Sequence, residues 1–524
     1  MWDVICIGSG TGSLAAATTL AKSGRSVLVL ESHSQIGGLT HTFARREGRW
    51  STGFHYTGWP TCYQNDFPEL WRILTSDRAP WQRLPENNDV YIRPDGVFTK
   101  RSSRELYRSD LYDAFPEEKS AIDRYLADMQ SILHEYLRFM RLQSIPPILE
   151  KMGVGWYQGR RFLRMDQMPV QEYMDSIGAS QRLRETLWFN WGNFDGHPER
   201  TSIGAYAVPI EYMMDGLWTP RDGASAVAKA FKESLEQWGG EIRRNSPVSE
   251  IVLRNNSVCS VRVGEELIRC RKVVSGIGAK ETYGLLESTN RPPHAERINS
   301  MPSTVSILTV YLSLIPEKLQ AMDLNAVNYW VECEADGMYH YWEDFEELPP
   351  WFVLSLASKF QKQASPYSRN ISAEIFVGVQ SKSFKKWVGT RTQRRGSNYV
   401  ELKSQLTQLV LSQAERTWSG FRDAVCYAEA STPLTIESYT GHQGGAAYGI
   451  APRPGRYSER SLRCETGIGG LVLAGQDVSA AGVIGAFYGG LAAASTLLRR
   501  DAAQIILENR HFPFIERVTR GVIS

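Results

Sequence analysis

The chain has 524 residues, which is too long for one hydrophobic core and predicts two domains with a discontinuous boundary. Its net charge of +2, with 42% hydrophobic and 22% charged residues, argues against a nucleic acid as the main partner. The seven cysteines are scattered and include no C-x-x-C pair, which favours reduced thiols and argues against a structural zinc site. We therefore expect no bound metal.

The first forty residues have the pattern of a βαβ unit. Asp3–Ile7 is a short apolar run that predicts a buried strand, and the glycine-rich segment Gly8–Ser13 follows it directly. Apolar residues at helical spacing predict a helix over Leu14–Ser23, which Gly24 ends. Arg25–Glu31 is a second strand with an acid at its tip. Such a unit is typical of a dinucleotide site.

The turn inside this unit suits a pyrophosphate. Gly8 allows a tight turn, Gly10 lets the backbone approach the ligand, and the helix N-terminus offers N–H groups to the anion. Glu31 can accept a hydrogen bond from a ribose hydroxyl. Ser13 stands where a third glycine is usual, a small change that helix–strand packing can tolerate. The alternative is a glycine-rich turn that binds nothing.

Two further glycine-containing segments follow. The pair Gly37-Gly38 predicts a second close approach of backbone and ligand. Thr52–Gly58 contains His55, whose ordinary pKa near neutrality makes it the best candidate for catalytic proton transfer, with Tyr56 as a weaker one. The alternative for His55 is a structural hydrogen bond in a tight loop.

Residues 64 to 215 have mainly helical patterns, such as Glu117–Met140 and Val170–Ser176. The segment Tyr136–Met168 interleaves aromatic and aliphatic residues with arginines and Lys151. Such a surface can lie on an anionic bilayer, or it can be a helical cap with a solvated face.

Strand patterns dominate much of the remaining chain. After a predicted helix over Ala224–Trp238, four short strands form a meander; a sheet with one long helix over Tyr399–Thr417 follows. The meander strands are predicted over Val248–Leu253, Val258–Val263, Leu267–Cys270 and Lys272–Ser275. The later strands are predicted over Val305–Leu314, Met338–Trp342, Phe352–Leu356 and Ala373–Val377.

Near the C-terminus, a strand over Leu471–Ala474 leads into Gly475-Gln476-Asp477. The 21 residues Val478–Leu498 include no charged residue, and a stretch of this length could span a membrane. Their richness in Gly, Ala and Ser favours instead a buried helix against a cofactor.

These motifs resemble a flavin-dependent group that contains retinol saturase, carotenoid cis–trans isomerase and the bacterial phytoene desaturases. The resemblance spans nearly the whole chain and is closest to the saturase branch. The matching pieces are Gly8-Ser9-Gly10 with Glu31, Gly37-Gly38, His41-Thr42-Phe43, Thr52–Gly58, Pro220–Gly223, Gly475–Val478 and Ala481–Ala486.

The resemblance implies an α/β fold: a discontinuous Rossmann-like FAD-binding domain of the glutathione-reductase and amine-oxidase type, and a substrate domain with a mixed sheet and helices. The first would comprise residues 1–63, 216–299 and 431–524, and the second residues 64–215 and 300–430.

By resemblance, Val248 contacts the adenine end through its backbone, Asp477 binds the ribityl chain, and the turn Gly482–Ile484 faces the flavin O2 side. For Asp477 a helix N-cap is the alternative. His442 and Tyr448 belong to another glycine-rich segment and could line the pocket, with a structural role as the alternative. The complete set of expected cofactor residues is Gly8, Gly10, Thr11, Gly12, Ser13, Glu31, Ser32, Gly37, Gly38, Leu39, Thr40, Val248, Gly475, Asp477, Gly482, Val483 and Ile484.

The expected function is that of an FAD enzyme acting on a carbon–carbon double bond of a long apolar lipid, a retinoid, carotenoid or unsaturated fatty-acyl compound. Saturation by hydride transfer is the first choice, and desaturation or isomerisation of the same class is the alternative. A flavin amine oxidase and a non-catalytic prenyl-binding protein are hypotheses of other classes.

No second dinucleotide motif is found, so we expect an electron donor or acceptor that binds transiently. The first strand begins close to Met1, which predicts the cytoplasm, with association at the inner face of a membrane left open.

Overall fold

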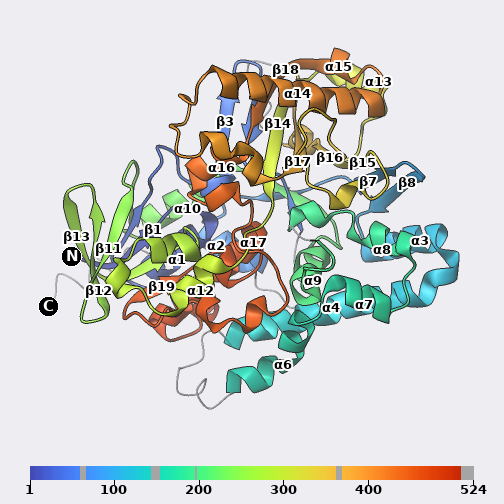
Figure 1. Cartoon of the computed structure of the whole chain (residues 1–524). Helices are drawn as coiled ribbons and strands as arrows, with labels where there is room; N and C mark the ends of the chain where they lie inside the picture. The colour runs from blue at the N-terminus through green and yellow to red at the C-terminus, as the bar shows by residue number, and fades with distance from the viewer. Residues whose placement is uncertain (59–66, 143–153, 195–196, 362–368, 509–524) are drawn as a thin grey trace.

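The computed structural model describes residues 1–58, 67–142, 154–194, 197–361 and 369–508. Its first sheet has seven strands in the order β10-β2-β1-β13-β12-β11, with β19 paired to β13 (Figure 1). These strands are β1 (Trp2–Ile7), β2 (Val27–Leu30), β10 (Glu241–Arg243), β11 (Val248–Arg254), β12 (Ser257–Val263), β13 (Glu266–Ser275) and β19 (Leu471–Leu473). Segments from both ends and the middle of the chain thus form one sheet, which confirms the predicted fold class.

The last two predicted meander strands are one strand, β13, and their separation was wrong. Its first half pairs antiparallel with β12, as in Leu267↔Arg262, and its second half pairs parallel with β1, as in Val273↔Ile5. Arg271, at the predicted break, is exposed, and the strand continues through it. The meander therefore runs without interruption into the cofactor sheet.

Helices α1 (Thr11–Lys22), α10 (Ser225–Gln237) and α17 (Gly482–Leu498) pack beside this sheet. The contact between α1 and α17 is a seam of glycines, because a Cβ atom on Gly490 would overlap the carbonyl oxygen of Gly12. The long uncharged stretch is therefore a buried helix on α1. Among the described residues, none of the helices combines the length and apolar character needed to cross a membrane.

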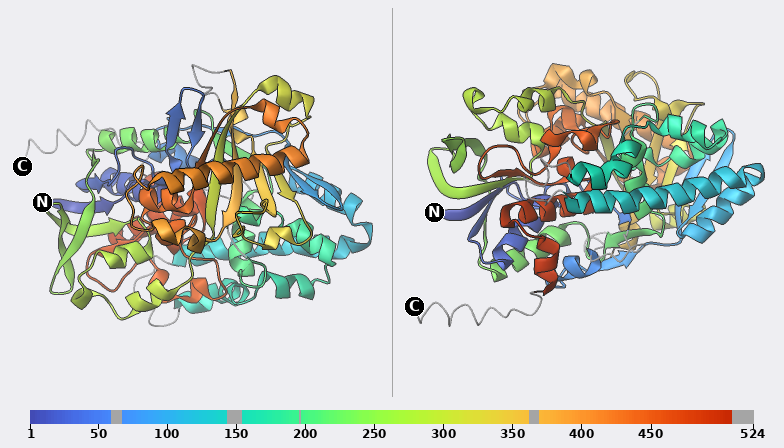
Figure 2. Two further views of the ribbon diagram at one scale, coloured as in Figure 1. Left: turned by 45° about the horizontal axis from the view of Figure 1, so that its top comes forward. Right: turned by 90° about the horizontal axis from the view of Figure 1, so that it is seen from below.

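The second sheet has seven strands in the order β18-β14-β17-β16-β15-β7-β8. It is mixed, because β15 and β7 are parallel whereas neighbours such as β14 and β17 are antiparallel. Its strands are β7 (Asn87–Arg93), β8 (Gly96–Arg101), β14 (Ser306–Leu314), β15 (Asn328–Glu332), β16 (Trp351–Ser355), β17 (Ile371–Val379) and β18 (Val425–Ser431). Helix α14 (Ser397–Thr417) runs across this sheet in Figure 2.

Strand β14 shows how the second sheet separates two environments. Leu308, Val310 and Leu312 belong to the core that includes α14 residues, whereas Ile307 and Thr309 line a cavity. This is the alternation expected of a strand with two different faces. One face of the sheet is therefore structural core and the other is a wall of the candidate site.

Within the mainly helical residues 64 to 215, residues 87–101 form the hairpin β7–β8, whose strands pair from Arg93↔Gly96 onward. One prediction about the second sheet was wrong. The predicted strand Met338–Trp342 is instead a 3-10 turn over Gly337–Tyr339, preceded by Asp336 at φ +61°, a left-handed conformation that ends extended backbone.

Helices cover the remaining side of the molecule, with the long α4 visible along it in Figure 2. They are α2 (Phe67–Leu74), α3 (Arg104–Ala114), α4 (Lys119–Leu142), α6 (Val154–Asp166), α7 (Val170–Ser176), α8 (Gln181–Trp188) and α9 (Ile203–Tyr212). Smaller elements are β3 (Thr42–Arg45), β4 (Gly48–Ser51), β5 (Thr57–Gly58), β6 (Trp81–Arg83), β9 (Leu217–Pro220), α11 (Ala279–Gly284), α12 (His294–Ser300), α13 (Pro316–Ala321), α15 (Phe421–Ala424), α16 (Pro433–Thr440) and α18 (Ala502–Glu508).

The segment considered for membrane contact contributes to the core where it is described. Phe139 and Phe162 are buried, and the ring of Phe162 lies 5.1 Å from that of Tyr457. Ile145, Ile148, Leu149, Lys151 and the side chains of Arg141, Trp156 and Tyr157 lie outside what the structure describes. A membrane-contact surface and the two domain boundaries stay predictions.

Candidate cofactor and substrate cavity

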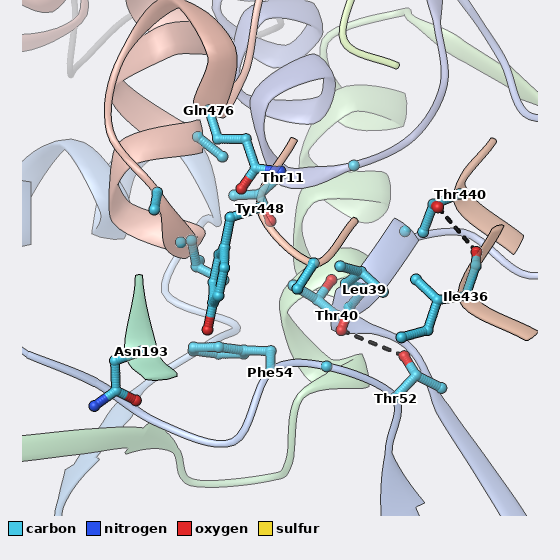
Figure 3. A pocket seen from close by; sticks show the side chains of 18 of the residues that line it. Thr11, Leu39, Thr40, Thr52, Phe54, Asn193, Ile436, Thr440, Tyr448 and Gln476 are labelled. Carbon is cyan, nitrogen blue, oxygen red and sulfur yellow. Dashed lines mark hydrogen bonds between the residues drawn. The ribbon is translucent and has the colours of Figure 1, made fainter. Parts of the chain in front are cut away.

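A cavity of about 350 Å³ extends from the first glycine-rich turn to the second sheet (Figure 3). It brings together residues from both ends of the chain, and most of the predicted site residues lie on its wall. The predicted residues that line it are Gly8, Gly10, Thr11, Gly12, Glu31, Ser32, Gly37, Gly38, Leu39, Thr40, His55, Tyr56, Gly475, Asp477, Gly482, Val483 and Ile484. His442 and Tyr448 line it as well.

The first glycine turn leaves room for a ligand against the backbone. Gly8 has φ +82°, and a Cβ atom there would lie 2.7 Å from Ile277. A Cβ atom on Gly10 would project into open space, and one on Gly38 would lie 3.3 Å from Gly10 Cα. Gly10 is also the N-cap of α1, so first-turn N–H groups are not capped by a side chain. This cradle fits a pyrophosphate.

Glu31 is held in place at the tip of β2. Its Oε2 accepts from Ser9 N at 2.8 Å, and its Oε1 accepts from His33 N at 2.8 Å. Gly37 N donates to Ser9 Oγ at 3.0 Å, so Ser9 links Glu31 to the second glycine pair. The carboxylate is therefore oriented before any ligand binds.

Asp477 lies on the cavity wall in a segment that packs against the first glycine turn, because a Cβ atom on Gly12 would lie 2.7 Å from Gly475 Cα. Its Oδ2 accepts from Ala279 N at 2.8 Å and its Oδ1 accepts from Ile450 N at 3.0 Å. Ala279 begins α11, whereas the N-cap of α17 is Ala481. Asp477 thus caps a helix, but it is α11 and not the helix that follows it, and its carboxylate also joins two loops of the cavity wall.

The first turn of α17 borders the cavity at Gly482, Val483 and Ile484. Gly482 has φ +85°, which a side chain would disfavour. The free N–H groups and positive dipole end of this helix suit a developing negative charge.

Ser13 and Val248 are the two predicted cofactor residues that do not line the cavity. Ser13 Oγ donates to Ile7 O at 3.2 Å, which bonds α1 to β1 where the usual glycine would only pack. Gly276 gives the serine its space. Val248 starts β11, two residues after Ser246, whose N–H donates to Glu31 O at 2.8 Å.

His55 and Tyr56 border the cavity in uncharged forms. Burial lowers the pKa of His55 to about 4, and the ring lies 4.9 Å from that of Phe376 in an edge contact. Burial raises the pKa of Tyr56, and its hydroxyl donates to Asn193 Oδ1 at 2.8 Å. Near pH 7 the cavity therefore presents a neutral imidazole and a phenol.

An aromatic wall, which the sequence analysis missed, completes the cavity. Trp191 and Trp351 lie with ring centroids 4.9 Å apart, and Trp330 and Phe376 line the same space. They come from three strands and a 3-10 turn that are far apart in sequence. Trp351 and Val353 both line the cavity, and their alternation along one strand was the only local pattern that could have predicted part of this wall.

Comparison with known proteins agrees with this arrangement. A family model described as flavin containing amine oxidoreductase matches residues 14–321. The all-trans-retinol 13,14-reductase of Rattus norvegicus is 27% identical over 526 residues, covering 95% of this chain and 86% of that protein. The chloroplastic prolycopene isomerase of Daucus carota is 23% identical over 473 residues, covering 86% of this chain and 72% of that protein.

Solved structures share the fold. Cyclohexylamine oxidase from Brevibacterium oxydans superposes with a TM-score of 0.62 at 16% identity, covering 97% of this chain and 99% of that one. Wild-type putrescine oxidase bound to putrescine gives a TM-score of 0.63, also at 16% identity, with 97% and 99% covered. The resemblance to the saturase and isomerase group is confirmed, and since the family model spans more than half of the sequence, this chain belongs to the flavin containing amine oxidoreductase family.

Proposed function

We propose that this protein is an FAD-dependent oxidoreductase that saturates a carbon–carbon double bond of a long apolar molecule. The observation that carries the proposal is that one cavity joins the glycine cradle at Gly10 to the aromatic wall around Trp351. A dinucleotide and an apolar compound can therefore meet in one water-poor space. The relatives named as a retinol reductase and a prolycopene isomerase support the substrate class.

The cradle, Asp477 and the first turn of α17 would together hold FAD. Gly8–Gly12 and the α1 N-terminus would bind the pyrophosphate, Glu31 a ribose, and Val248 the adenine edge through its backbone. Asp477 would accept from the ribityl chain, and Gly482–Ile484 would donate N–H groups to the ring carbonyl. When bound, the flavin supplies hydride-transfer chemistry.

The chain itself would orient the alkene and supply a proton. The wall of Trp191, Trp330 and Trp351 excludes water and gives flat apolar contact to a conjugated or aliphatic chain. His55 and Tyr56 are the candidate proton donors, because both line the cavity and both carry a proton on a neutral side chain. Desaturation would reverse these transfers, and isomerisation would need no net electron transfer.

An anaerobic single-turnover experiment tests the proposal. The purified flavoprotein is chemically reduced and mixed with a retinoid, a carotenoid or an unsaturated acyl lipid, while the oxidised protein is mixed separately with an aliphatic amine. We expect one lipid to reoxidise the flavin with loss of a double bond. An isomerised lipid without reoxidation would indicate an isomerase, and reduction by the amine would indicate an amine oxidase. A protein that takes up no FAD would contradict the enzyme hypothesis itself.

A further inference from the structure

Glu374 is a fully buried carboxyl group in the central strand β17, behind the wall of the cavity. Its neighbours across the sheet are Tyr311 on β14 and Ser355 on β16. The pKa of Tyr311 is raised by burial, so the phenol stays neutral at physiological pH. A carboxyl group in such surroundings is costly to keep charged, which calls for an explanation of its presence.

The titratable side chain that Glu374 approaches on the cavity side is His55. Their atoms Oε2 and Nδ1 lie 3.6 Å apart, a few tenths of an ångström longer than a hydrogen bond. Such catalytic contacts are often long before the substrate binds. Nδ1 is buried, and the His55 side chain keeps 10% exposure where it lines the cavity. The ring thus has Nδ1 toward Glu374, while His55 also borders the cavity.

The ring of His55 is also fixed in orientation. Phe376 lies two residues beyond Glu374 on β17, hence on the same face of the strand, and contacts the His55 ring edge at 4.9 Å between centroids. The main-chain oxygen of His55 accepts from Thr219 Oγ1 at 3.0 Å. The loop and the ring of His55 are therefore held in place, while a proton can move between Glu374 and His55.

Burial shifts the pKa values of Glu374 and His55 in opposite directions. Burial raises the pKa of Glu374 to about 8, although Ser358 and the main chain of Ser51 act in the opposite direction. Burial lowers the pKa of His55 to about 4. Between these values the carboxyl group is protonated and the imidazole is neutral, with a single N–H proton. A protonated carboxyl group can donate to Nδ1, which leaves the imidazole proton on Nε2.

We propose that Glu374 is a positioning residue and proton reservoir for His55. This inference rests on the proposed function. Hydride transfer to one alkene carbon would be the chemistry that bound, reduced FAD supplies, and the other carbon would take the Nε2 proton of His55. The Glu374 proton would move to Nδ1, which keeps the imidazole neutral and leaves a carboxylate. The alkene would gain two electrons and two hydrogens as the flavin is oxidised. Before the next turnover Nε2 would take a proton from solvent and the Nδ1 proton would return to Glu374, which restores both groups.

The first test needs no substrate. Infrared spectra of the whole flavoprotein are recorded across the pH range for wild type, Glu374→Gln and Glu332→Gln. Glu332 is the matched control, since it is a buried glutamate on β15 of the same sheet that does not line the cavity. We expect a carboxylic-acid carbonyl band that is lost with a midpoint near pH 8 in wild type and in Glu332→Gln. That band should be missing from Glu374→Gln. Its persistence in Glu374→Gln would overturn the proposal.

The second test is the pH dependence of flavin reoxidation by the lipid in a single turnover. An acid of pKa near 8 acts in its protonated form, so the wild-type rate should be high below pH 8 and fall above it. We expect Glu374→Gln to react about 10²-fold more slowly and to lose this ionisation. A slow variant that keeps the fall near pH 8 would assign Glu374 a structural role only. If no lipid reoxidises the flavin, the proposed function fails, while the infrared result still decides whether Glu374 stores a proton.

Discussion

The contact between Ser13 and Gly276 offers a test of how this chain replaces the missing third glycine. A Cβ atom on Gly276 would overlap Ser13 Oγ and lie 3.3 Å from Ser13 Cβ. Gly276→Ala should therefore turn the serine hydroxyl away from Ile7 O, breaking a buried hydrogen bond. An unpaired buried hydroxyl costs about 1–3 kcal/mol. Ser13→Gly should cost about 1–2 kcal/mol, from the same hydrogen bond and from helix propensity.

The double variant separates this contact from general damage. With Ser13→Gly present only the 3.3 Å contact to the main-chain nitrogen of residue 13 remains, so Gly276→Ala should then cost less, with a coupling of about 1–3 kcal/mol in a double-mutant cycle. Gly284→Ala is the control, because a Cβ atom there meets open space. Urea unfolding of the flavin-saturated protein, followed by circular dichroism and flavin fluorescence, measures the midpoints. Equal costs of Gly276→Ala in both backgrounds would refute the reasoning.

Three further outcomes are expected. Gly490→Ala should destabilise the protein by about 1–3 kcal/mol in the same unfolding assay, because the added methyl group overlaps the Gly12 carbonyl; an unchanged midpoint would show that α1 and α17 can separate freely. Glu31→Gln should weaken FAD binding about 10–100-fold by isothermal titration, through loss of a charged acceptor worth about 1.5–3 kcal/mol; unchanged affinity would place the ribose elsewhere. Asp477→Asn should weaken FAD binding and lower the melting temperature together, because the amide can no longer accept from both Ala279 N and Ile450 N; an effect on only one of the two would separate the cofactor role from the structural one.

Local patterns predicted the nucleotide half of the molecule well. The segment from Trp2 to Glu31 combines a strand, a glycine turn, a helix and a second strand within one short stretch, so its structure depends little on distant residues. Asp477 was singled out for a similar reason, as an acid that follows strand β19 within four residues. The family resemblance joined these two ends into one site.

The substrate half could not be predicted in the same way. Trp191, Trp330 and Phe376 reach one cavity only because the second sheet brings their strands and turn together. Glu374 is a single acid in an apolar strand, which gives no hint that it meets His55, some 320 residues earlier in the chain. Contacts set by sheet order carry no local sequence signal.

The glycine seam between α1 and α17 also has a consequence for how the protein is made. About 480 residues separate Gly12 from Gly490, so at 5–20 residues per second the ribosome would need roughly 20–100 s to deliver the second helix after the first. During that interval the apolar side of α1 that α17 will cover has no native partner, and the nucleotide cradle lacks the wall that Gly475, Asp477 and Gly482 later supply. The order of synthesis therefore places completion of the cradle near the end of folding.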